Sequence, residues 1–552
     1  MSPESTIKIV KVPTTPFTDQ RPGTSGLRKK TRVFMQPHYV ANFVQSTFKV
    51  IRKTLGELSK HTLVVGGDGR YYNREATQLI ISIAVANGVG RLLVARGGLM
   101  STPAVSAVIR RQHALGGLVL SASHNPGGIN EDFGIKYNVQ NGGPAPEAVT
   151  EAIYQETLHI NEYLMAEGAE VDIDREGSSK LGSTEVVVID SLKDYCDLME
   201  ELFDFDSLRK LFAGGFRMTF DAMHAITGPY ARRLLEERLG ASQGTVINGE
   251  PLPDFGGVHP DPNLVRAADL VAQLAKEAGP DFGAACDGDG DRNLILGRNF
   301  FVSPGDSLAV IAEHAQNAIP AFRGGLAGVA RSMPTSTAAD RVAKSLGIRS
   351  YETPTGWKFF GNLLDAGLCS VCGEESFGTG SNHIREKDGV WAVLAWLSIL
   401  AHTGKSVEEV VRNHWLRFGR SYYQRHDFEG LDAGAAAKMI SALHEKLPTL
   451  AGQSFAGESI ASADDFSYTD PVDGSTTTKQ GVRLLLADGS RVVVRLSGTG
   501  TSGATVRLYV ERYRNDGGTA DVKEVLGPLL HEAKELLRLR EFFGRDEASV
   551  VT

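Results

Sequence analysis

Short apolar runs that alternate with helical patterns are the feature that most limits the fold of this chain. Residues 62–65, 91–95 and 117–120 have the pattern of strands, and residues 73–87 and 102–111 between them have the pattern of helices. This alternation predicts βαβ units and a mostly parallel sheet.

The same plan recurs twice further along the chain. The second copy combines apolar strand patterns at 216–220 and 282–286 with a helical pattern at 228–239. The third combines strand patterns at 325–330 and 368–372 with a helical pattern at 336–346. Each copy delivers one polar, glycine-bearing loop from a strand end, and such repetition predicts three similar domains around one cleft.

The last part of the chain follows a different pattern. Residues 482–486 and 491–496 flank Asp488-Gly489, a hairpin signal, and a third strand pattern at 506–511 precedes a long helix over about 522–543. The predicted fold class is therefore α/β, with three similar mixed α/β domains and a C-terminal antiparallel α+β domain around one central cleft. The predicted domains are 1–192, 193–305, 306–422 and 423–552.

Length, charge and hydropathy limit the class of protein. A chain of 552 residues exceeds a single core, and its net charge of -8 disfavours nucleic-acid binding. Residues 1–17 hold no apolar core of signal-peptide type, and the longest apolar run, 390–401, is shorter than the roughly 18 residues that span a bilayer. We expect a cytoplasmic enzyme with that run as a buried helix.

Cysteine usage points to a structural role for the thiols. Four cysteines make a disulfide scaffold unexpected in a chain of this size, although Cys369 and Cys372 form one CxxC. Spacing three in a strand-like run directs the two thiols to opposite faces, and a second CxxC that would complete a zinc site is missing from the sequence. We therefore interpret both cysteines as structural.

A loop of small and polar residues follows the strand pattern at 117–120 and reads Ser121-Ala122-Ser123-His124-Asn125-Pro126-Gly127-Gly128. A strand end places such side chains where α/β sheets carry their chemistry. Ser123 is the candidate nucleophile. The alternative is a capped turn, because Ser, Asn, Pro and Gly are also ordinary turn residues.

Three carboxylates alternate with glycines after the strand pattern at 282–286. Asp287, Asp289 and Asp291 can surround one hard divalent cation with oxygen ligands. A calcium loop is excluded because Arg292 and Arg298 stand where its glycine and glutamate are needed. We expect a magnesium site that leaves coordination free for a phosphate oxygen, with a solvated acidic turn as the alternative.

Two glycine-bearing loops have the composition of phosphate sites. Residues 496–503 read LSGTGTSG and contain GxGxxG, but a dinucleotide site needs a helix next, and 505–510 alternate like a strand. A hydroxyl-rich backbone nest flanked by Arg495 and Arg507 suits a free phosphate monoester, with a plain glycine turn as the alternative. The early loop at 21–30 mixes hydroxyls, glycines and cations and is a weaker signal of the same kind.

A polyol could be bound after the strand pattern at 368–372. Glu374 and Ser376 supply hydrogen-bonding oxygens, and cations stand at 383–387, although each is also an ordinary surface residue. A nucleophilic serine, a divalent metal, a polyol loop and a phosphate loop together indicate phosphoryl transfer to or from a sugar phosphate.

These motifs resemble the α-D-phosphohexomutase superfamily and, within it, most closely the phosphoglucomutases. The similar segments stand in the family's order over nearly the whole chain: PGTSGLR at 22–28, SASHNPGG at 121–128, DGDGDR at 287–292, GEESFG at 373–378, RLSGTGTSGAT at 495–505 and FGR at 543–545. One departure is Ser121, where a threonine is common in the family.

The resemblance implies a role for each matched residue. Ser123 would be the phosphoserine, and Asp287, Asp289 and Asp291 would hold Mg²⁺ together with an oxygen of phosphorylated Ser123. Glu374 and Ser376 would bind sugar hydroxyls. The nonreacting phosphate would be bound by Arg495, Ser497, Gly498, Thr499 and Arg507. The remaining active-site contacts would be Thr24, Arg28, His124, Lys136, Arg292, Thr355, Gly356 and Lys387, of which Arg28, His124, Lys136 and Lys387 would be catalytic.

The implied activity is that of an isomerase that interconverts glucose 1-phosphate and glucose 6-phosphate through glucose 1,6-bisphosphate. The GEESFG loop favours glucose over mannose, and Lys387 or His124 would take the acceptor proton. The expected partners are small sugar phosphates, without nucleic acid or membrane, for a monomer or weak dimer. Alternatives are a mutase of broader specificity, a bisphosphate-sugar synthase, and a scaffold relative without turnover.

Overall fold

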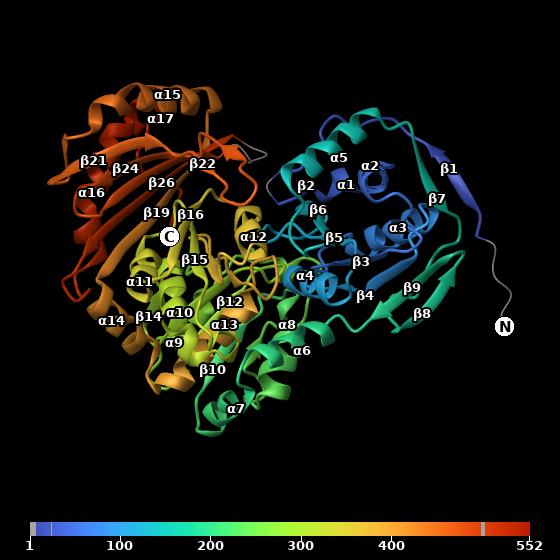
Figure 1. The fold of residues 1–552 in the computed structure, drawn as a ribbon, viewed down its shortest axis with the longest axis horizontal. Helices are drawn as coiled ribbons and strands as arrows, with labels where there is room; N and C mark the ends of the chain where they lie inside the picture. Colours follow the sequence, from blue (N-terminus) through green and yellow to red (C-terminus); the bar gives the residue numbers. More distant parts are fainter. Residues whose placement is uncertain (1–6, 24, 498–502) are drawn as a thin grey trace. The chain divides into compact units, whose positions relative to one another are not determined.

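Three sheets of the protein contain parallel strand pairs, and a further seven-stranded sheet near the C-terminus is antiparallel (Figure 1). The computed structural model describes residues 7–23, 25–497 and 503–552. Contacts divide these residues into two compact units. The first comprises the described residues up to Phe301 with His314–Gly325 and Ser376–Gly404, and the second comprises the others.

The first sheet of the first unit has seven strands in the order β2-β6-β5-β3-β4-β9-β8. Strand β3 pairs in parallel with β4 and β5, as the alternating pattern predicts. The strands are β2 (Leu27–Lys30), β3 (Thr62–Gly67), β4 (Arg91–Leu99), β5 (Gly116–Leu120), β6 (Asp132–Val139), β8 (Gly177–Leu181) and β9 (Thr184–Ile189). A separate antiparallel pair joins β1 (Ile9–Pro13) to β7 (Glu162–Ala166).

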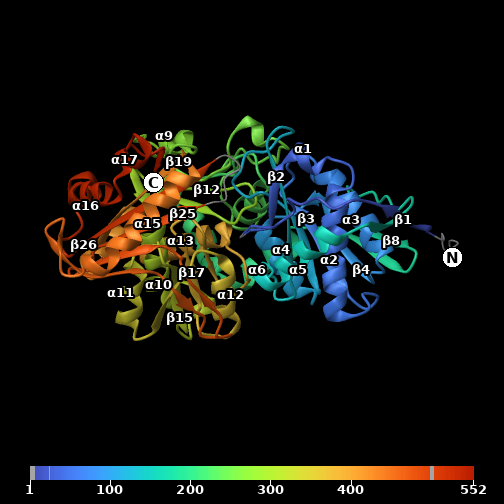
Figure 2. The same cartoon turned by 90° about the horizontal axis from the view of Figure 1, so that it is seen from above.

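Helices cover this sheet. Helix α3 lies alongside β3 and β4 (Figure 2) and contacts α2, while α4 packs on β3 and β5 and against α6. Leu63 and Leu118 belong to the core cluster that includes α2 and α3, and the alternate residues Val64 and Val119 are equally buried. Both faces are therefore covered. The helices are α1 (Thr31–Phe34), α2 (Tyr39–Leu55), α3 (Asn73–Ala86), α4 (Thr102–Arg111), α5 (Glu147–His159) and α6 (Lys193–Leu202).

The second sheet has the order β11-β10-β12-β13-β14, in which β10 pairs in parallel with β11 and β12. Its strands are β10 (Met218–Asp221), β11 (Val246–Ile247), β12 (Phe282–Cys286), β13 (Asn293–Gly297) and β14 (Phe300–Val302). Nearby elements are α7 (Phe205–Ala213), α8 (Thr227–Ala231), η1 (Arg232–Arg238), η2 (Phe255–Gly257), α9 (Ala268–Leu274), η3 (Pro320–Phe322) and β18 (Thr379–Ser381). The apolar run at 390–401 is the buried helix α13 (Gly389–Thr403), as expected.

The second unit contains another parallel arrangement and an antiparallel sheet. Strand β15 (Gly328–Ser332) pairs in parallel with β16 (Arg349–Thr353) and β17 (Val371–Gly373). The helices around them are α10 (Pro304–Ala318), whose first ten residues belong to this unit, α11 (Ala338–Leu346), α12 (Trp357–Asp365) and α14 (Val407–Phe418). All four cysteines, including the CxxC pair, lie in the described part of the chain, where each is buried and outside any disulfide.

The C-terminal sheet has the order β20-β21-β24-β25-β26-β19-β27, and its paired strands are antiparallel, which confirms the predicted hairpin and sheet. The strands are β19 (Arg420–Leu431), β20 (Ser454–Phe455), β21 (Glu458–Asp465), β24 (Val482–Leu486), β25 (Arg491–Ser497), β26 (Ala504–Arg514) and β27 (Val550–Val551). Helices α15 (Ala433–Leu450), α16 (Val522–Leu537) and α17 (Leu539–Phe543) pack with it in one apolar core, and β22 (Tyr468–Thr469) pairs with β23 (Thr476–Thr477).

Some predicted elements differ in detail, and the strand expected at 368–372 begins only at Val371. The strand expected at 325–330 begins at Gly328, because Gly325 has a φ of 92° that a strand does not accommodate. The helix expected at 228–239 changes to a π-helix at Arg232, which hydrophobic periodicity does not reveal because Leu234 and Leu235 stay buried. The final helix breaks at Arg538, whose φ is 53°.

A buried ion pair in the antiparallel sheet of the second unit also contacts the segment that follows the parallel strand β15. Glu511 on β26 accepts hydrogen bonds from Arg491 Nε at 2.6 Å and from Ser421 Oγ at 2.7 Å. It also accepts from the amide of Thr337 at 2.9 Å, and Arg491 Nη1 donates to the carbonyl of Met333 at 2.6 Å. Burial alone would raise the pKa of Glu511, but Arg491 and Arg341 outweigh it and lower that pKa from 4.5 to about 2.

We expect Glu511→Gln to reduce the stability of the second unit by about 3 kcal/mol, because it removes the counter-charge 2.6 Å from buried Arg491 and leaves the longer 3.6 Å contact with Glu352. Since the folded-state pKa is depressed, this contribution is present above pH 4.5 and is lost as the pH falls towards 2. Urea unfolding of both proteins at pH 7 and pH 3 measures the difference.

The control is Glu408→Gln, whose exposed partner Arg412 lies 2.7 Å away on the same helix. Exposed pairs of this type contribute about 0.3–0.5 kcal/mol. Equal unfolding midpoints for the Glu511 and Glu408 variants would contradict the assigned role of the buried pair.

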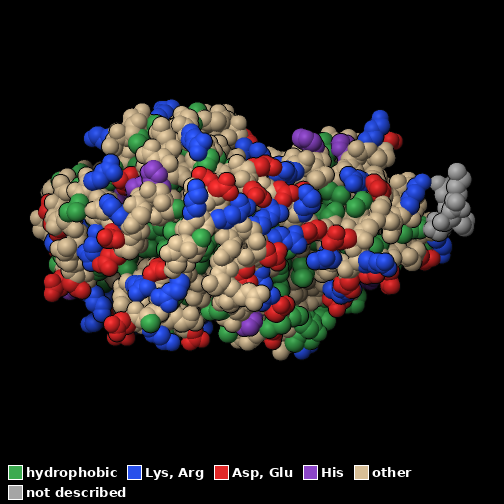
Figure 3. Space-filling model, turned by 90° about the horizontal axis from the view of Figure 1, so that it is seen from below, with side chains coloured by type: hydrophobic (Ala, Val, Ile, Leu, Met, Phe, Trp, Pro, Cys, Tyr) green, Lys and Arg blue, Asp and Glu red, His purple; other side chains and the backbone are tan. Residues whose placement is uncertain are grey.

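The distribution of surface charge and the length of the apolar helices bear on whether a nucleic acid or a membrane could be a partner. On the face shown in Figure 3, Lys and Arg side chains are interspersed with Asp and Glu side chains. Among the described residues, no single helix is long and apolar enough to cross a bilayer. Helices α13 and α14 reach the necessary length and composition only when they are counted together.

Candidate active site

The predicted serine loop lies at the carboxyl end of β5, between β5 and β6. Ser123 is 3% exposed and has a φ of 54°, in the left-handed region that non-glycine residues rarely adopt. Its amide donates to Ser121 Oγ at 2.7 Å, and its own Oγ donates to Asp287 Oδ2 at 2.8 Å. The hydroxyl therefore points at the predicted metal loop.

The three aspartates follow β12 and converge. Ligand oxygens of Asp287, Asp289 and Asp291 lie within 4.8 Å of one another, and all three side chains are buried. Gly288 allows the close approach of the two loops, because a Cβ there would lie 2.5 Å from the carbonyl oxygen of Ser123. Gly290 has a φ of 80°, which turns the chain between the second and third carboxylates.

The hydrogen bonding of this cluster leaves room for a cation. Thr102 Oγ1 donates to Asp289 Oδ2 at 2.6 Å, and Lys387 Nζ lies 3.2 Å from Asp291 Oδ2. Within the described part of the chain, Oδ1 of Asp289 and Oδ1 of Asp291 are buried without a hydrogen-bond partner. Burial, together with the neighbouring Asp291 and Asp289, raises the pKa of Asp287 well above its usual range. Unpartnered carboxylate oxygens beside a destabilised charge fit Mg²⁺.

Cationic side chains from several elements surround the cluster. Arg28 lies on β2, and Lys136 lies on the neighbouring strand β6. Glycine is required at position 26, just before β2, because a Cβ on that residue would lie 2.6 Å from Lys136 Cβ. Burial lowers the pKa of Arg28 despite the nearby charge of Asp289, with Arg292 adding to the decrease. The amide of Arg292 donates to Asp287 Oδ1 at 3.0 Å. Together with Lys387, these three cations could neutralise a phosphoryl group.

His124 lies beside this group as a neutral imidazole. Burial, followed by the charges of Arg292 and Arg28, lowers its pKa well below 6.5. Its ring stacks on that of His259 with the centroids 6.2 Å apart. The lowered pKa leaves the ring deprotonated at pH 7 and makes it a weak proton acceptor.

Sequence analysis missed several side chains that support the site. Glu386 Oε1 accepts from Lys136 Nζ at 3.1 Å and from Asn138 Nδ2 at 2.9 Å. Asp388 accepts from Tyr195 Oη at 2.6 Å and contacts His383 Nε2 at 2.9 Å. Glu386 and Asp388, the neighbours of Lys387 in the sequence, are therefore held by residues far away in the chain, Lys136 being 250 positions from Glu386.

Only one local signal pointed to this support. Asp388 stands directly before the apolar run at 390–401 and caps α13 by accepting from the amide of Trp391 at 3.0 Å. That capping position can be recognised from the sequence. The partners of Glu386 cannot, because they lie on another strand.

The predicted sugar-binding residues fall in both units. In the second unit, the amide of Gly356 donates to Glu374 Oε1 at 3.0 Å, and Thr355 Oγ1 is buried without a hydrogen-bond partner among the described residues. Ser376 is half-buried in the first unit next to Phe377, whose carbonyl accepts from the amide of Asn293 at 2.9 Å. Glu375 is fixed by Thr335, whose Oγ1 accepts from its amide at 2.8 Å.

The predicted phosphate loop joins β25 to β26 in the second unit. Arg495 and Arg507 are directly opposite each other in the register of these strands, and Ser497 is opposite Thr505. Both arginines are half-buried, Arg495 Nε donates to the carbonyl of Gln480 at 3.3 Å, and Arg507 Nε lies 3.7 Å from Asp427 Oδ2. Gly498, Thr499 and the early-loop residue Thr24 lie outside the described residues.

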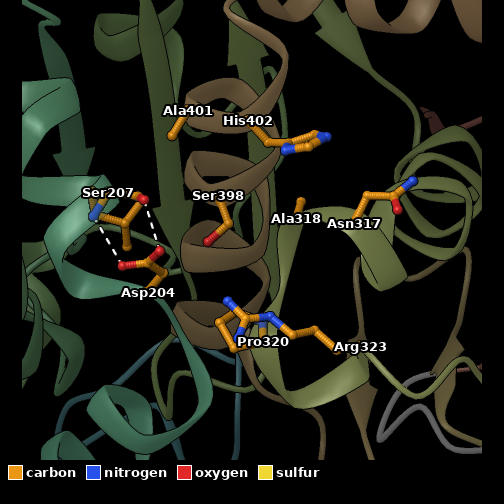
Figure 4. A pocket seen from close by; sticks show the side chains of 10 residues that line it. Asp204, Ser207, Asn317, Ala318, Pro320, Arg323, Ser398, Ala401 and His402 are labelled. Atoms are coloured by element: carbon orange, nitrogen blue, oxygen red, sulfur yellow. Dashed lines mark hydrogen bonds between the residues drawn. The ribbon is translucent and has the colours of Figure 1, made fainter.

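A separate small hollow in the first unit is lined by other residues (Figure 4). Asp204 there accepts from Ser207 Oγ at 2.8 Å and caps α7, while Ser398 donates to the carbonyl of Leu394 at 2.9 Å. These polar groups thus serve a helix end and a helix turn, and none of the predicted site residues lines the hollow.

A buried serine beside three carboxylates and several cations defines a centre for metal-dependent phosphoryl transfer. Comparison with known families agrees. Models described as Phosphoglucomutase/phosphomannomutase, alpha/beta/alpha domains I, II and III, match residues 19–164, 193–299 and 304–418. A model described as Phosphoglucomutase-1, C-terminal domain, matches residues 420–549.

Individual relatives extend over the whole chain. A phosphoglucomutase of Rhizobium radiobacter is 55% identical over 548 residues, which cover 99% of this chain and 100% of the relative. A cytoplasmic phosphoglucomutase of Populus tremula is 52% identical and covers 99% of each. The crystal structure of the Paramecium exocytosis-sensitive phosphoprotein pp63/parafusin, a phosphoglucomutase in its open form, superposes with a TM-score of 0.92 at 49% identity over 99% of both chains.

The chain therefore belongs to the phosphoglucomutase family. Members of this family are isomerases that transfer a phosphoryl group within the substrate and use Mg²⁺. The predicted fold class, three α/β domains and a C-terminal domain with an antiparallel sheet, is confirmed.

Proposed function

We propose that the protein interconverts glucose 1-phosphate and glucose 6-phosphate through phosphorylated Ser123 and glucose 1,6-bisphosphate. The observation that carries the proposal is the 2.8 Å hydrogen bond from Ser123 Oγ to Asp287 within the carboxylate cluster. It places the nucleophile beside the only His/Cys/Asp/Glu group among the described residues whose ligand atoms converge as a metal site requires. The relatives named phosphoglucomutase support the same activity.

The chain's own residues divide the work of the transfer. Asp287, Asp289 and Asp291 hold Mg²⁺, which when bound supplies positive charge that offsets the phosphoryl oxygens. Arg28, Arg292, Lys136 and Lys387 add fixed cationic charge around Ser123 Oγ. The sugar hydroxyl attacks the phosphorus of phosphorylated Ser123, its proton goes to a nearby base, and the Ser123 oxygen leaves with the bonding pair.

Two residues are candidates for that base. His124 is neutral and buried, the state that accepts a proton. Lys387, whose Nζ lies 3.2 Å from Asp291 Oδ2, is the alternative; in its charged form it stabilises negative charge instead of accepting the proton. The bound bisphosphate then reorients, so that its other phosphate faces Ser123, and returns that phosphoryl group to Ser123.

Residues outside the carboxylate cluster are proposed to bind the rest of the substrate. Arg495, Ser497 and Arg507, with Gly498 and Thr499, bind the phosphate that is not reacting, because paired arginines give charge-assisted contacts to phosphate oxygens. Glu374 and Ser376 bind sugar hydroxyls, and Thr24, Thr355 and Gly356 complete the contacts. Since the intermediate turns around, one distal phosphate site serves both half-reactions.

The test is conversion of glucose 1-phosphate to glucose 6-phosphate by purified protein with Mg²⁺ and a trace of glucose 1,6-bisphosphate. We expect turnover that stops when EDTA removes the metal and returns when Mg²⁺ is restored. Mannose 1-phosphate should react more slowly. Equal rates on both sugars would favour a mutase of broad specificity, and the absence of turnover on either would overturn the proposal.

Three further assignments remain proposals. The domains are proposed as 1–192, 193–305, 306–422 and 423–552, and the family-model matches begin within a few residues of the last three starts. The cytoplasm is the proposed compartment, as in the Populus tremula relative, while an Arabidopsis thaliana relative is chloroplastic. A monomer or weak dimer is the proposed state, which sedimentation analysis measures.

A further inference from the structure

Arg70 is a fully buried arginine that contacts the serine loop from a different segment of the first unit. It follows β3, and its side chain and that of its partner Asp68 are both 0% exposed. Arg70 Nε lies 3.0 Å from both oxygens of Asp68, and Nη2 lies 2.9 Å from Oδ2. The charge of Arg70 is therefore balanced within its own loop.

The rest of the guanidinium is directed at backbone carbonyls of the loop that carries Ser123. Nη2 donates to the carbonyl of Ser123 at 2.8 Å, and Nη1 donates to the carbonyls of Asp132 at 2.8 Å and Asn125 at 3.4 Å. The guanidinium therefore donates hydrogen bonds from all three of its nitrogens, to Asp68 through Nε and to backbone carbonyls through Nη1 and Nη2. The ring of Phe255 lies 5.2 Å from its central carbon and covers one face.

The position of the Ser123 carbonyl determines whether the unusual backbone conformation of this residue is kept. With a φ of 54°, Ser123 has a conformation that costs free energy and persists only where its surroundings hold it. The amide of Ser123 is held by Ser121 Oγ on one side, and its carbonyl by Arg70 on the other. This conformation directs Oγ towards Asp287.

We propose that Arg70 is a positioning residue for the phosphoryl transfer, which acts by holding the Ser123 carbonyl so that Oγ stays aligned with the carboxylate cluster. The inference rests on the proposed function of Ser123. A buried ion pair is a costly way to gain stability alone, because well-packed apolar residues often do as well or better. A planar fork that reaches three carbonyls and a carboxylate gives directional hold that neither an apolar side chain nor lysine can reproduce.

The test uses Arg70→Lys, which keeps the charge and loses the fork, beside Arg74→Lys as the matched control. Arg74 stands four residues later and pairs with exposed Asp174 at 2.6 Å. The measurements are kcat, KM for glucose 1-phosphate, the thermal midpoint, and the rate at which glucose 1,6-bisphosphate phosphorylates Ser123, followed by peptide mass.

We expect Arg70→Lys to lower kcat and the rate of Ser123 phosphorylation together by about 10²-fold, with KM within about 3-fold of wild type, because misplacement by about 1 Å costs this much in rate. Arg74→Lys should change none of these. A folded Arg70→Lys protein with wild-type kcat, or a loss in proportion to the fraction unfolded, would overturn the inference.

Asp68→Asn is the second variant, assayed below its own thermal midpoint: it retains an acceptor for Arg70 but removes the buried counter-charge, so we expect it to lose stability as Glu511→Gln does. We expect a fall in kcat of about 10-fold at unchanged KM, and a wild-type kcat would contradict the role. Wild-type protein that glucose 1,6-bisphosphate does not phosphorylate at Ser123 would instead contradict the proposed function, so the two failures are distinguishable.

Discussion

Ser123→Ala lowers kcat for glucose 1-phosphate by at least about 10⁴-fold, because the proposed phosphoenzyme cannot form without the hydroxyl. KM and the thermal midpoint change little, since the substitution removes one oxygen from a loop that other contacts hold. The Oγ of Ser123 makes a hydrogen bond to Asp287 Oδ2 that alanine cannot replace, so the carboxylate cluster loses one donor. Coupled detection of glucose 6-phosphate measures the loss over several decades.

The matched control is Ser178→Ala, which removes an exposed hydroxyl from β8 that donates to Glu185 at 3.1 Å. Its kcat should equal that of wild type. Mass analysis should find the phosphoryl group on the peptide that contains Ser123 in wild-type protein and not in the alanine variant. Residual turnover above about 1% in Ser123→Ala would mean that another residue carries the phosphoryl group.

The Asp287→Asn variant tests two effects of the metal site separately: its contribution to catalysis and the loss of stability that its clustered charges cause in the metal-free protein. We expect kcat to fall about 10³-fold, equivalent to about 4 kcal/mol, because a ligand charge for Mg²⁺ is lost. Without metal, the variant should unfold at a temperature equal to or above that of wild type. Burial and two neighbouring carboxylates raise the pKa of Asp287, so its charge is unfavourable in the metal-free protein.

Thermal unfolding with and without Mg²⁺ completes this test. Metal at 100 times its Kd stabilises a single site by about 2.7 kcal/mol, so wild type should gain stability and Asp287→Asn should not. Asp206→Asn is the control, because Asp206 is exposed and pairs with Arg209 at 2.8 Å on the same helix. A Mg²⁺-dependent gain in Asp287→Asn equal to that in wild type would contradict the assignment of the metal ligands.

The strands, helices and polar loops could be predicted because their signals are local. The apolar run at 117–120 becomes β5, and the serine loop follows it as expected. The apolar segment at 282–286 becomes β12 and leads into the three aspartates. Element ends were harder, as at Gly325 and Arg538, because a single residue with positive φ stops a strand or helix without changing hydrophobic periodicity.

Contacts between distant segments could not be predicted in the same way. Thr102 donates to Asp289 across 187 positions, and Tyr195 donates to Asp388 across 193. Arg70 lies in the short stretch Gly69-Arg70-Tyr71, which has no pattern that indicates a role. Their roles depend on which strand ends the fold brings together.

The sequence by itself determined the α/β repeat, the antiparallel last domain and the residue types of the site, because periodicity and short motifs depend only on neighbouring positions. Tertiary structure alone decided that Ser123 Oγ meets Asp287, that Asp289 and Asp291 keep unpartnered oxygens among the described residues, and that Arg70 holds the Ser123 carbonyl. The physical reason is that hydrogen bonds act over about 3 Å in space, whatever the separation along the chain.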